Sequence, residues 1–143
     1  MTKLHTYLNF DGKAEEAFEF YKSVFGGEFT QFVRFKDFPM EGMTIPEEEG
    51  AKMIHISLPI GDSTVLMASD ILESLGQTFV QGNSVYISID PSSKEEADKL
   101  FNGLSQGGDV EMPIADQAWG DYFGSFKDKF GVCWMVNFSQ SRS

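Results

Sequence analysis

Lys-Ala-Glu-Glu-Ala-Phe-Glu-Phe-Tyr-Lys-Ser-Val-Phe-Gly-Gly, at residues 13–27, has a counterpart later in the chain. Residues 93–108 read Ser-Lys-Glu-Glu-Ala-Asp-Lys-Leu-Phe-Asn-Gly-Leu-Ser-Gln-Gly-Gly. Aligning Ala17 with Ala97 also aligns two later apolar pairs at the same offset of 80 residues: Tyr21 with Phe101, and Val24 with Leu104. Apolar residues recur every three or four positions in both stretches, which is typical of amphipathic helices. The repeat predicts a duplicated structural unit.

One strand-like stretch precedes each predicted helix, and three follow it. Apolar and polar residues alternate there with a period of two, as in strands with one buried face. We expect strands at residues 4–10, 29–35, 53–58 and 64–69, and again at 84–89, 110–114, 122–126 and 133–138. The order is β-α-β-β-β, twice. The pattern predicts an α+β fold with modules at about residues 1–72 and 80–138, within a single domain of residues 1–143. Ser92 and Glu95 fit a capping box at the second helix.

Charge and composition exclude several classes of partner. The chain has 22 acidic and 11 basic residues, a net charge of −11, which repels phosphate backbones and anionic lipids. We therefore expect neither a nucleic acid nor a membrane partner. No apolar run approaches the roughly 20 residues that cross a bilayer, and no signal-peptide core follows the start. With Cys133 as the only cysteine, no intramolecular disulfide can form, and we expect a cytoplasmic protein.

Four motifs support a family resemblance. They read Glu15-Glu16-Ala17-Phe18-Glu19-Phe20-Tyr21, Leu66-Met67-Ala68-Ser69-Asp70, Trp119-Gly120-x-x-Phe123-Gly124 and Asp128-Lys129-Phe130-Gly131-Val132-x-Trp134-Met135-Val136-Asn137. With the duplicated unit, they resemble the PhnB-like group of the vicinal oxygen chelate superfamily, which includes glyoxalase I, extradiol dioxygenases and bleomycin-resistance proteins. The resemblance implies a glyoxalase-like fold, in which two βαβββ modules form a cupped eight-stranded mixed sheet around a cavity, commonly in a homodimer. It implies no single reaction.

The resemblance also implies where a metal would bind. Metal-using members place one ligand on the first and one on the last strand of each module, and the matching positions here look like His5, Met67, Ser84 and Met135. A neutral, soft thioether binds Zn²⁺, Ni²⁺, Mn²⁺ or Fe²⁺ poorly at such a site. Only His5 is a retained ligand-type residue, so we predict neither the usual metal centre nor a cofactor. The sequence leaves open a divalent metal held by other residues.

The two histidines offer a catalytic interpretation. His55 lies on the predicted third strand, with the same parity as Met53 and Ser57. It and His5 would face one cavity, with Asp70 at a nearby strand end. Such a set could bind a metal or shuttle protons near neutral pH. A hydrogen-bonded histidine on a half-buried strand is the competing interpretation for each imidazole.

Aromatic and apolar side chains are the candidates for contacting a ligand. An aromatic wall of two tryptophans, a tyrosine and a phenylalanine would suit a flat or apolar molecule, although core packing would explain the same residues. An inward-facing Arg34 could clamp a carboxylate or phosphonate, whereas an outward-facing one would pair with surface acids. The predicted ligand-binding residues are Tyr7, Arg34, Met67, Trp119, Tyr122, Phe123, Trp134 and Met135.

Three other features have a plain alternative. Cys133 could be a nucleophile, but its apolar neighbours favour a buried filler. Residues 36–50 could form a lid through Phe38, Met40 and Met43, or a solvated acidic loop. Proteins of the PhnB-like group are sometimes labelled ubiquinone-pathway methyltransferases. A methyl-donor site would use a glycine-rich turn between strand and helix, whereas the glycine pairs here follow the helices as caps.

The leading hypothesis is a dimeric PhnB-like protein that holds a small molecule in an aromatic cavity without the usual metal. The alternative is a lyase, isomerase or dioxygenase in which His5, His55 and Asp70 position a metal or move protons on a vicinal-oxygen substrate.

Overall fold

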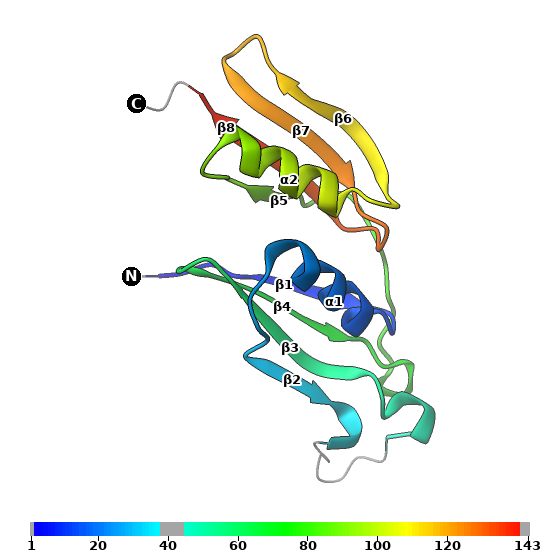
Figure 1. The fold of residues 1–143 in the computed structure, drawn as a ribbon. Helices are drawn as coiled ribbons and strands as arrows, with labels where there is room; N and C mark the ends of the chain where they lie inside the picture. The colour runs from blue at the N-terminus through cyan, green and yellow to red at the C-terminus, as the bar shows by residue number, and fades with distance from the viewer. Residues whose placement is uncertain (1, 38–44, 141–143) are drawn as a thin grey trace. The chain divides into compact units, whose positions relative to one another are not determined.

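The computed structural model describes residues 2–37 and 45–140, and the chain divides into two compact units, Met1–Val80 and Gln81–Ser143. Unit 1 contains β1 (Thr6–Phe10), α1 (Ala14–Phe25), β2 (Gln31–Arg34), β3 (Met53–Ile60) and β4 (Thr64–Asp70). Unit 2 contains β5 (Ile87–Ile89), α2 (Lys94–Leu104), β6 (Asp109–Asp116), β7 (Asp121–Lys127) and β8 (Cys133–Ser139). Each unit therefore has the predicted order β-α-β-β-β (Figure 1).

The sheets of the two units have the same topology. Their strand orders are β1-β4-β3-β2 and β5-β8-β7-β6. In each sheet the first strand pairs parallel to the last, and the remaining pairs are antiparallel. The predicted α+β fold of two βαβββ modules is confirmed, with one four-stranded mixed sheet in each unit.

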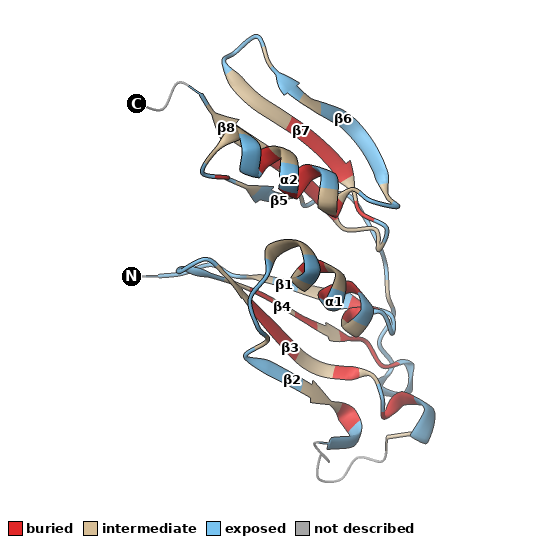
Figure 2. Cartoon of the chain, in the orientation of Figure 1, coloured by how far each residue is buried: buried red, intermediate tan, exposed pale blue. Residues whose placement is uncertain are grey.

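The α1 helix covers one face of the unit 1 sheet, as Figures 1 and 2 show. Its apolar stripe of Ala14, Ala17, Phe18 and Tyr21 is fully buried, at the positions that the helical spacing predicted. Burial of each aromatic side chain contributes about 2–3 kcal/mol. Acidic residues in the first turn and Lys22 in the last turn complement the helix dipole.

The α2 helix covers the unit 2 sheet in the same way, with Phe101 among its buried residues. Ser93 caps this helix by accepting from the Glu96 backbone N–H at 3.0 Å, so the predicted capping box is wrong by one residue. The helix approaches β7 closely at Gly124, where an added Cβ would lie 2.7 Å from the Phe101 ring. Only glycine fits this contact without a shift.

The connecting segments differ from the prediction in two places. The expected strand at residues 84–89 begins only at Ile87, and Val85 before it is 74% exposed. Single 3-10 turns at Phe35–Asp37 and Glu47–Glu49 lie at the two ends of the predicted lid, residues 36–50, whose Phe38, Met40 and Met43 lie outside the described residues. Within the described ranges, no helix has the length and apolar character needed to span a membrane.

Candidate functional site

Each sheet has one face that its own helix leaves uncovered. In unit 1 the strand register defines this open face, because side chains alternate across a sheet and paired residues share a side. We use the name open face 1 for the residues that point away from α1: His5, Tyr7, Asn9, Gln31, Val33, His55, Ser57, Val65, Met67 and Ser69. His5 continues the alternation of β1 by one residue before its start.

A row of three hydrogen-bonding side chains crosses open face 1. The Tyr7 Oη lies 3.4 Å from Nδ1 of His55, a long contact, while Nε2 of the same ring lies 2.8 Å from the Ser57 Oγ. The rings of Tyr7 and His55 are tilted, with centroids 5.7 Å apart. Tyr7 is 47% exposed and Ser57 is 5% exposed, so the row extends from solvent into the sheet. Both imidazole nitrogens therefore have partners.

His5 lies on the same face as His55. Its Nδ1 accepts from the Val65 backbone N–H at 3.3 Å, and its side chain is exposed. The register of β3 places His55 on open face 1, and the alternation of β1, continued by one residue, assigns His5 to the same face, while a cavity that encloses them stays a prediction.

Asp70 does not face this row. Its carboxylate is buried on the α1 side, where Oδ1 accepts from the Ala14 N–H at 3.0 Å and Oδ2 from the Met53 N–H at 2.9 Å. Lys13 at the N-cap position offers α1 no side-chain cap, so Asp70 supplies the anionic partner for the helix start. The interpretation of Asp70 as a catalytic partner of the histidines is therefore corrected: its role is structural.

Arg34 also lies on the α1 side. Its guanidinium binds Glu15 with both nitrogens, at 2.6 Å from Nη1 to Oε1 and 2.8 Å from Nη2 to Oε2. This pairing lowers the pKa of the Glu15 carboxyl. Glu15 of α1 thus occupies both guanidinium nitrogens of Arg34. The predicted ligand clamp is corrected to an ion pair between β2 and α1.

A bulge in β3 explains a further difference. Val33 pairs with His55 and Arg34 with Met53, so Ile54 is left over and the alternation shifts. Met53 is consequently fully buried and 3.7 Å from the Arg34 guanidinium, on the face opposite His55. The predicted shared parity of Met53 and His55 is wrong for this reason.

The unit 2 sheet has a corresponding open face, which we call open face 2. The register places on it Ser88, Phe123, Ser125, Cys133, Met135 and Asn137, and Tyr86 continues the alternation one residue before β5. Trp119, in the turn after β6, is 63% exposed and contacts Phe123 with ring centroids 6.3 Å apart. Two aromatic candidates, Trp119 and Phe123, are thus brought together, with Met135 on the same sheet face as Phe123.

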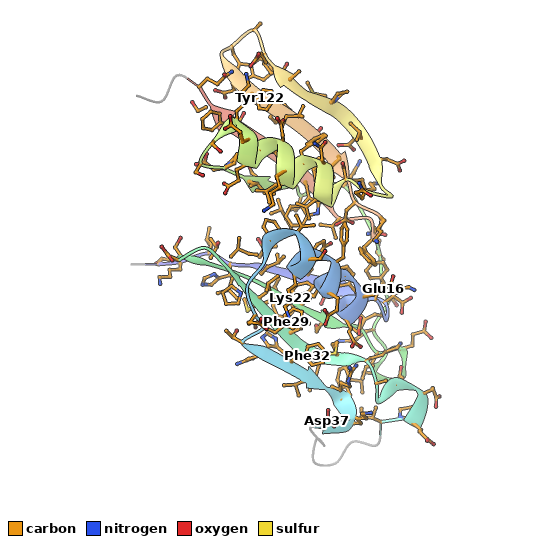
Figure 3. The ribbon with its side chains drawn as sticks, viewed as in Figure 1. Glu16, Lys22, Phe29, Phe32, Asp37 and Tyr122 are labelled. Carbon is orange, nitrogen blue, oxygen red and sulfur yellow. The ribbon has the colours of Figure 1, made fainter. Side chains whose placement is uncertain are left out.

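Trp134 and Tyr122 lie on the opposite face. Trp134 is 1% exposed, and its Nε1 donates to Asp128 at 2.8 Å. The Tyr122 hydroxyl donates to Asp98 of α2, consistent with its place in Figure 3. Both side chains belong to the packing between sheet and helix, so their assignment to a ligand wall is corrected.

The register also revises the implied metal positions. Tyr7 pairs with Met67 in unit 1, and Ser88 pairs with Met135 in unit 2. Two residues before Tyr7 and Ser88, just ahead of β1 and β5, come His5 and Tyr86, so Tyr86 is the positional counterpart of His5. Ser84 lies two residues further before β5, so the register favours Tyr86 over Ser84 at this position.

These four residues do not suit a divalent metal. The Tyr86 hydroxyl donates to both Glu111 oxygens, at 2.8 and 3.0 Å, and this bond raises the pKa of Tyr86 to about 12. The phenol is therefore protonated at neutral pH, while Met67 and Met135 offer neutral thioethers. No group of three His, Cys, Asp or Glu side chains suited to a metal occurs within residues 2–37 and 45–140.

Cys133 lies on open face 2, beside β7. Burial raises the pKa of its thiol, which disfavours the nucleophilic thiolate at neutral pH. The buried position agrees with the filler interpretation.

Sequence reasoning missed two residues of these faces. The Ser57 hydroxyl hydrogen-bonds to His55. The available signal was that the two residues are two positions apart on one predicted strand, so that their side chains share a face. Tyr86 occupies the position assigned to Ser84, and only the strand register could reveal this.

Comparison with known proteins identifies the family. A family model named 3-demethylubiquinone-9 3-methyltransferase matches residues 2–137. The chain belongs to this family. This PhnB-like chain is 29% identical to Protein YjdN of Escherichia coli over 94% of its length and 93% of that protein. It is 37% identical to PA1353 of Pseudomonas aeruginosa, with a TM-score of 0.85 and coverage of 97% and 98% of the two chains.

Two further structures support the PhnB-like assignment and the fold. A PhnB protein of Bacillus cereus is 28% identical, with a TM-score of 0.75 and coverage of 96% and 99%. A glyoxalase/bleomycin resistance protein/dioxygenase family enzyme of Burkholderia phytofirmans is 20% identical, with a TM-score of 0.59 and coverage of 94% and 96%, and shows the fold alone. The PhnB-like resemblance is confirmed, and so is the glyoxalase-like fold.

The family name does not by itself give this chain an activity. The turn between β1 and α1 contains one glycine, Gly12, and residues 90–93 before α2 contain none. Neither resembles the glycine-rich turn on which methyl-donor and dinucleotide sites depend. Methyl transfer is therefore not carried over to this PhnB-like chain.

Proposed function

We propose that this PhnB-like protein binds a small molecule on its open sheet faces without the metal centre of glyoxalase-type enzymes. The observation that carries the proposal is the row Tyr7–His55–Ser57 on open face 1. Both nitrogens of one imidazole contact hydroxyls on the sheet face opposite α1. Ligand sites typically combine apolar surface with a few such fixed polar groups.

Apolar neighbours complete the surface that we propose. Met67 and Val33 lie on open face 1 beside the polar row. Phe123 and Met135 lie on open face 2, with Trp119 against Phe123. These side chains would contact the carbon skeleton of a ligand, while the row fixes its orientation. We also propose that the two modules act together as one domain.

Amide-resolved NMR with a fragment set of neutral and charged small molecules tests this function. We expect perturbed amides to gather on β1, β3 and β4, or on β7 and β8, and to spare the solvent side of the helices. A set in which no fragment perturbs either open face would overturn the proposal. Metal analysis of protein purified without a histidine tag tests its second part, because stoichiometric metal would contradict it.

The same row favours a second candidate function. A histidine held between two hydroxyls has the components of a general acid–base group. In this alternative, His55 with His5 moves protons on a vicinal-oxygen substrate or holds a metal. Stoichiometric metal that is lost in His5→Ala or His55→Ala would support the alternative over the binding protein.

We also propose a cytoplasmic homodimer. The resemblance to the superfamily implies the dimer, and the exposed apolar side chains Val110 and Met112 on the edge strand β6 support it. Sedimentation should give a dimer at micromolar concentration, and a monomer there would contradict the assembly.

A further inference from the structure

Acidic residues are absent from open face 1 although the chain is rich in them. The protein has 22 acidic residues and a net charge of −11. In unit 1, the described acids lie on α1, in the segments that connect the strands and α1 or follow β4, or beneath α1 as Asp70. Among the residues that define open face 1, the ionisable groups are the imidazoles of His5 and His55 and the phenol of Tyr7.

Protonation of His55 would change what the row offers to a ligand. In the neutral ring one nitrogen accepts, so either Tyr7 or Ser57 must direct its hydroxyl hydrogen at the ring. In the imidazolium both nitrogens donate, and both hydroxyls can accept from the ring. The hydroxyl that donated to the neutral ring can then donate its hydrogen to a ligand instead. This holds for either tautomer of the neutral ring. Tyr7 is the exposed member of the row, so a ligand on this face can reach its side chain.

The charged ring would have no counter-ion within open face 1. Three side chains of open face 1 lie around the His55 ring. Val33 on β2 pairs with His55, and Tyr7 on β1 contacts the ring. Ser69 is the residue of this face on the β4 side, next to Ala68, which pairs with Ile56. None of these side chains carries a negative charge at neutral pH. A ligand that brings an anionic oxygen would supply the missing charge and gain charge-assisted hydrogen bonds, which are about twice as strong as neutral ones.

We propose that open face 1 binds its ligand through an oxyanion group, either a carboxylate or a phosphate-like group, together with a proton taken up at His55. The inference rests on the proposed binding function and names its ligand class. The chain's overall negative charge opposes the approach of anions, and salt screens this repulsion beyond about 10 Å. Comparisons of affinity therefore need constant ionic strength.

The two-histidine composition makes the test direct, because the imidazole NMR signals belong to His5 and His55 alone. Acetate and sulfate are the probes, since neither changes charge between about pH 5.5 and 8, where imidazoles titrate. Each should shift the His55 signals. The apparent affinity should fall by up to about tenfold per pH unit as the pH rises, since binding takes up one proton.

Three variants and one neutral probe isolate the cause. His55→Gln should abolish the pH dependence, and Tyr7→Phe should weaken binding while leaving its pH dependence in place. Tyr122→Phe, on the α2 side of unit 2, is the matched control and should bind like the unaltered protein. Acetamide, an uncharged analogue of acetate, should bind more weakly at low pH. If His55→Gln fails to fold, the test rests on two measurements: the pH series of binding by the unaltered protein, and the binding by Tyr7→Phe.

The possible results separate this inference from the proposed function. Binding of acetate and sulfate that is independent of pH, or equal binding of acetate and acetamide, overturns the oxyanion inference. If neutral fragments perturb open face 1 while both anions leave it unchanged, the inference fails and the binding function stands. If no fragment perturbs either open face, both fail.

Discussion

Replacing Asp70 by asparagine should lower the free energy of unfolding by about 2 kcal/mol. The carboxylate is 4% exposed and accepts from two backbone N–H groups, those of Ala14 and Met53. An amide keeps one accepting oxygen but turns its NH₂ towards the second donor. One charge-assisted bond, worth about 1.5–3 kcal/mol, is therefore lost. Asp70→Ala removes both acceptors and should cost about 3–5 kcal/mol.

Urea unfolding followed by circular dichroism measures this difference. Asp62→Asn, in the exposed turn between β3 and β4, makes the same chemical change and should alter stability by less than about 0.5 kcal/mol. Equal stability of the two asparagine variants would refute the structural role of Asp70. Loss of fragment binding by Asp70→Asn at unchanged stability would return this residue to the functional site.

Gly124→Ala should lower the free energy of unfolding by about 1–3 kcal/mol, because the added Cβ would lie 2.7 Å from a ring atom of α2. An unchanged urea midpoint would contradict that close contact. Trp134→Phe removes the N–H donor to Asp128 and should cost about 1–3 kcal/mol in urea unfolding, with fragment binding unchanged; weaker binding would restore Trp134 to the ligand site. Glu111→Gln should lower the pKa of Tyr86 from about 12 towards its ordinary value in an absorbance titration. Since the folded-state pKa is raised, the Tyr86–Glu111 bond stabilises the fold below about pH 10 and is lost as the pH rises through about 12. Identical alkaline titrations of variant and unaltered protein would contradict this cause.

The fold was predictable because its signals are local and occur twice. The stripe of Ala17, Phe18 and Tyr21 needs only helical periodicity to be recognised, and the later copy confirms the spacing. The end of a strand depends on its surroundings instead. Val85 continues the alternation of β5 in sequence, yet the structure leaves it exposed before the strand begins.

The site was predictable only in part, because a strand pattern does not say which face is covered. Neighbouring residues on a strand point to opposite sides, so Trp134 and Met135 could not both face a ligand, nor could Tyr122 and Phe123. Alternation alone would have separated each pair. Choosing the helix side for Trp134 needed the pairing of the strands.

Other features depend on contacts that no local pattern contains. The orientation of Met53 follows from the unpaired Ile54, and a bulge of one residue leaves no clear sequence mark. The partner of Arg34 lies on α1, and the partners of Asp70 include the start of the same helix. Such partners become visible only when the chain is folded.

The distant cap of α1 has a consequence for how the chain is made. The Ala14 amide and the Asp70 carboxylate are 56 residues apart in sequence. At about 5–20 residues per second, the ribosome adds that separation in roughly 3–11 s. During this interval the Ala14 amide at the start of the nascent helix lacks its carboxylate acceptor and the first turn frays, so α1 settles only when β4 has been synthesised and docks beside it.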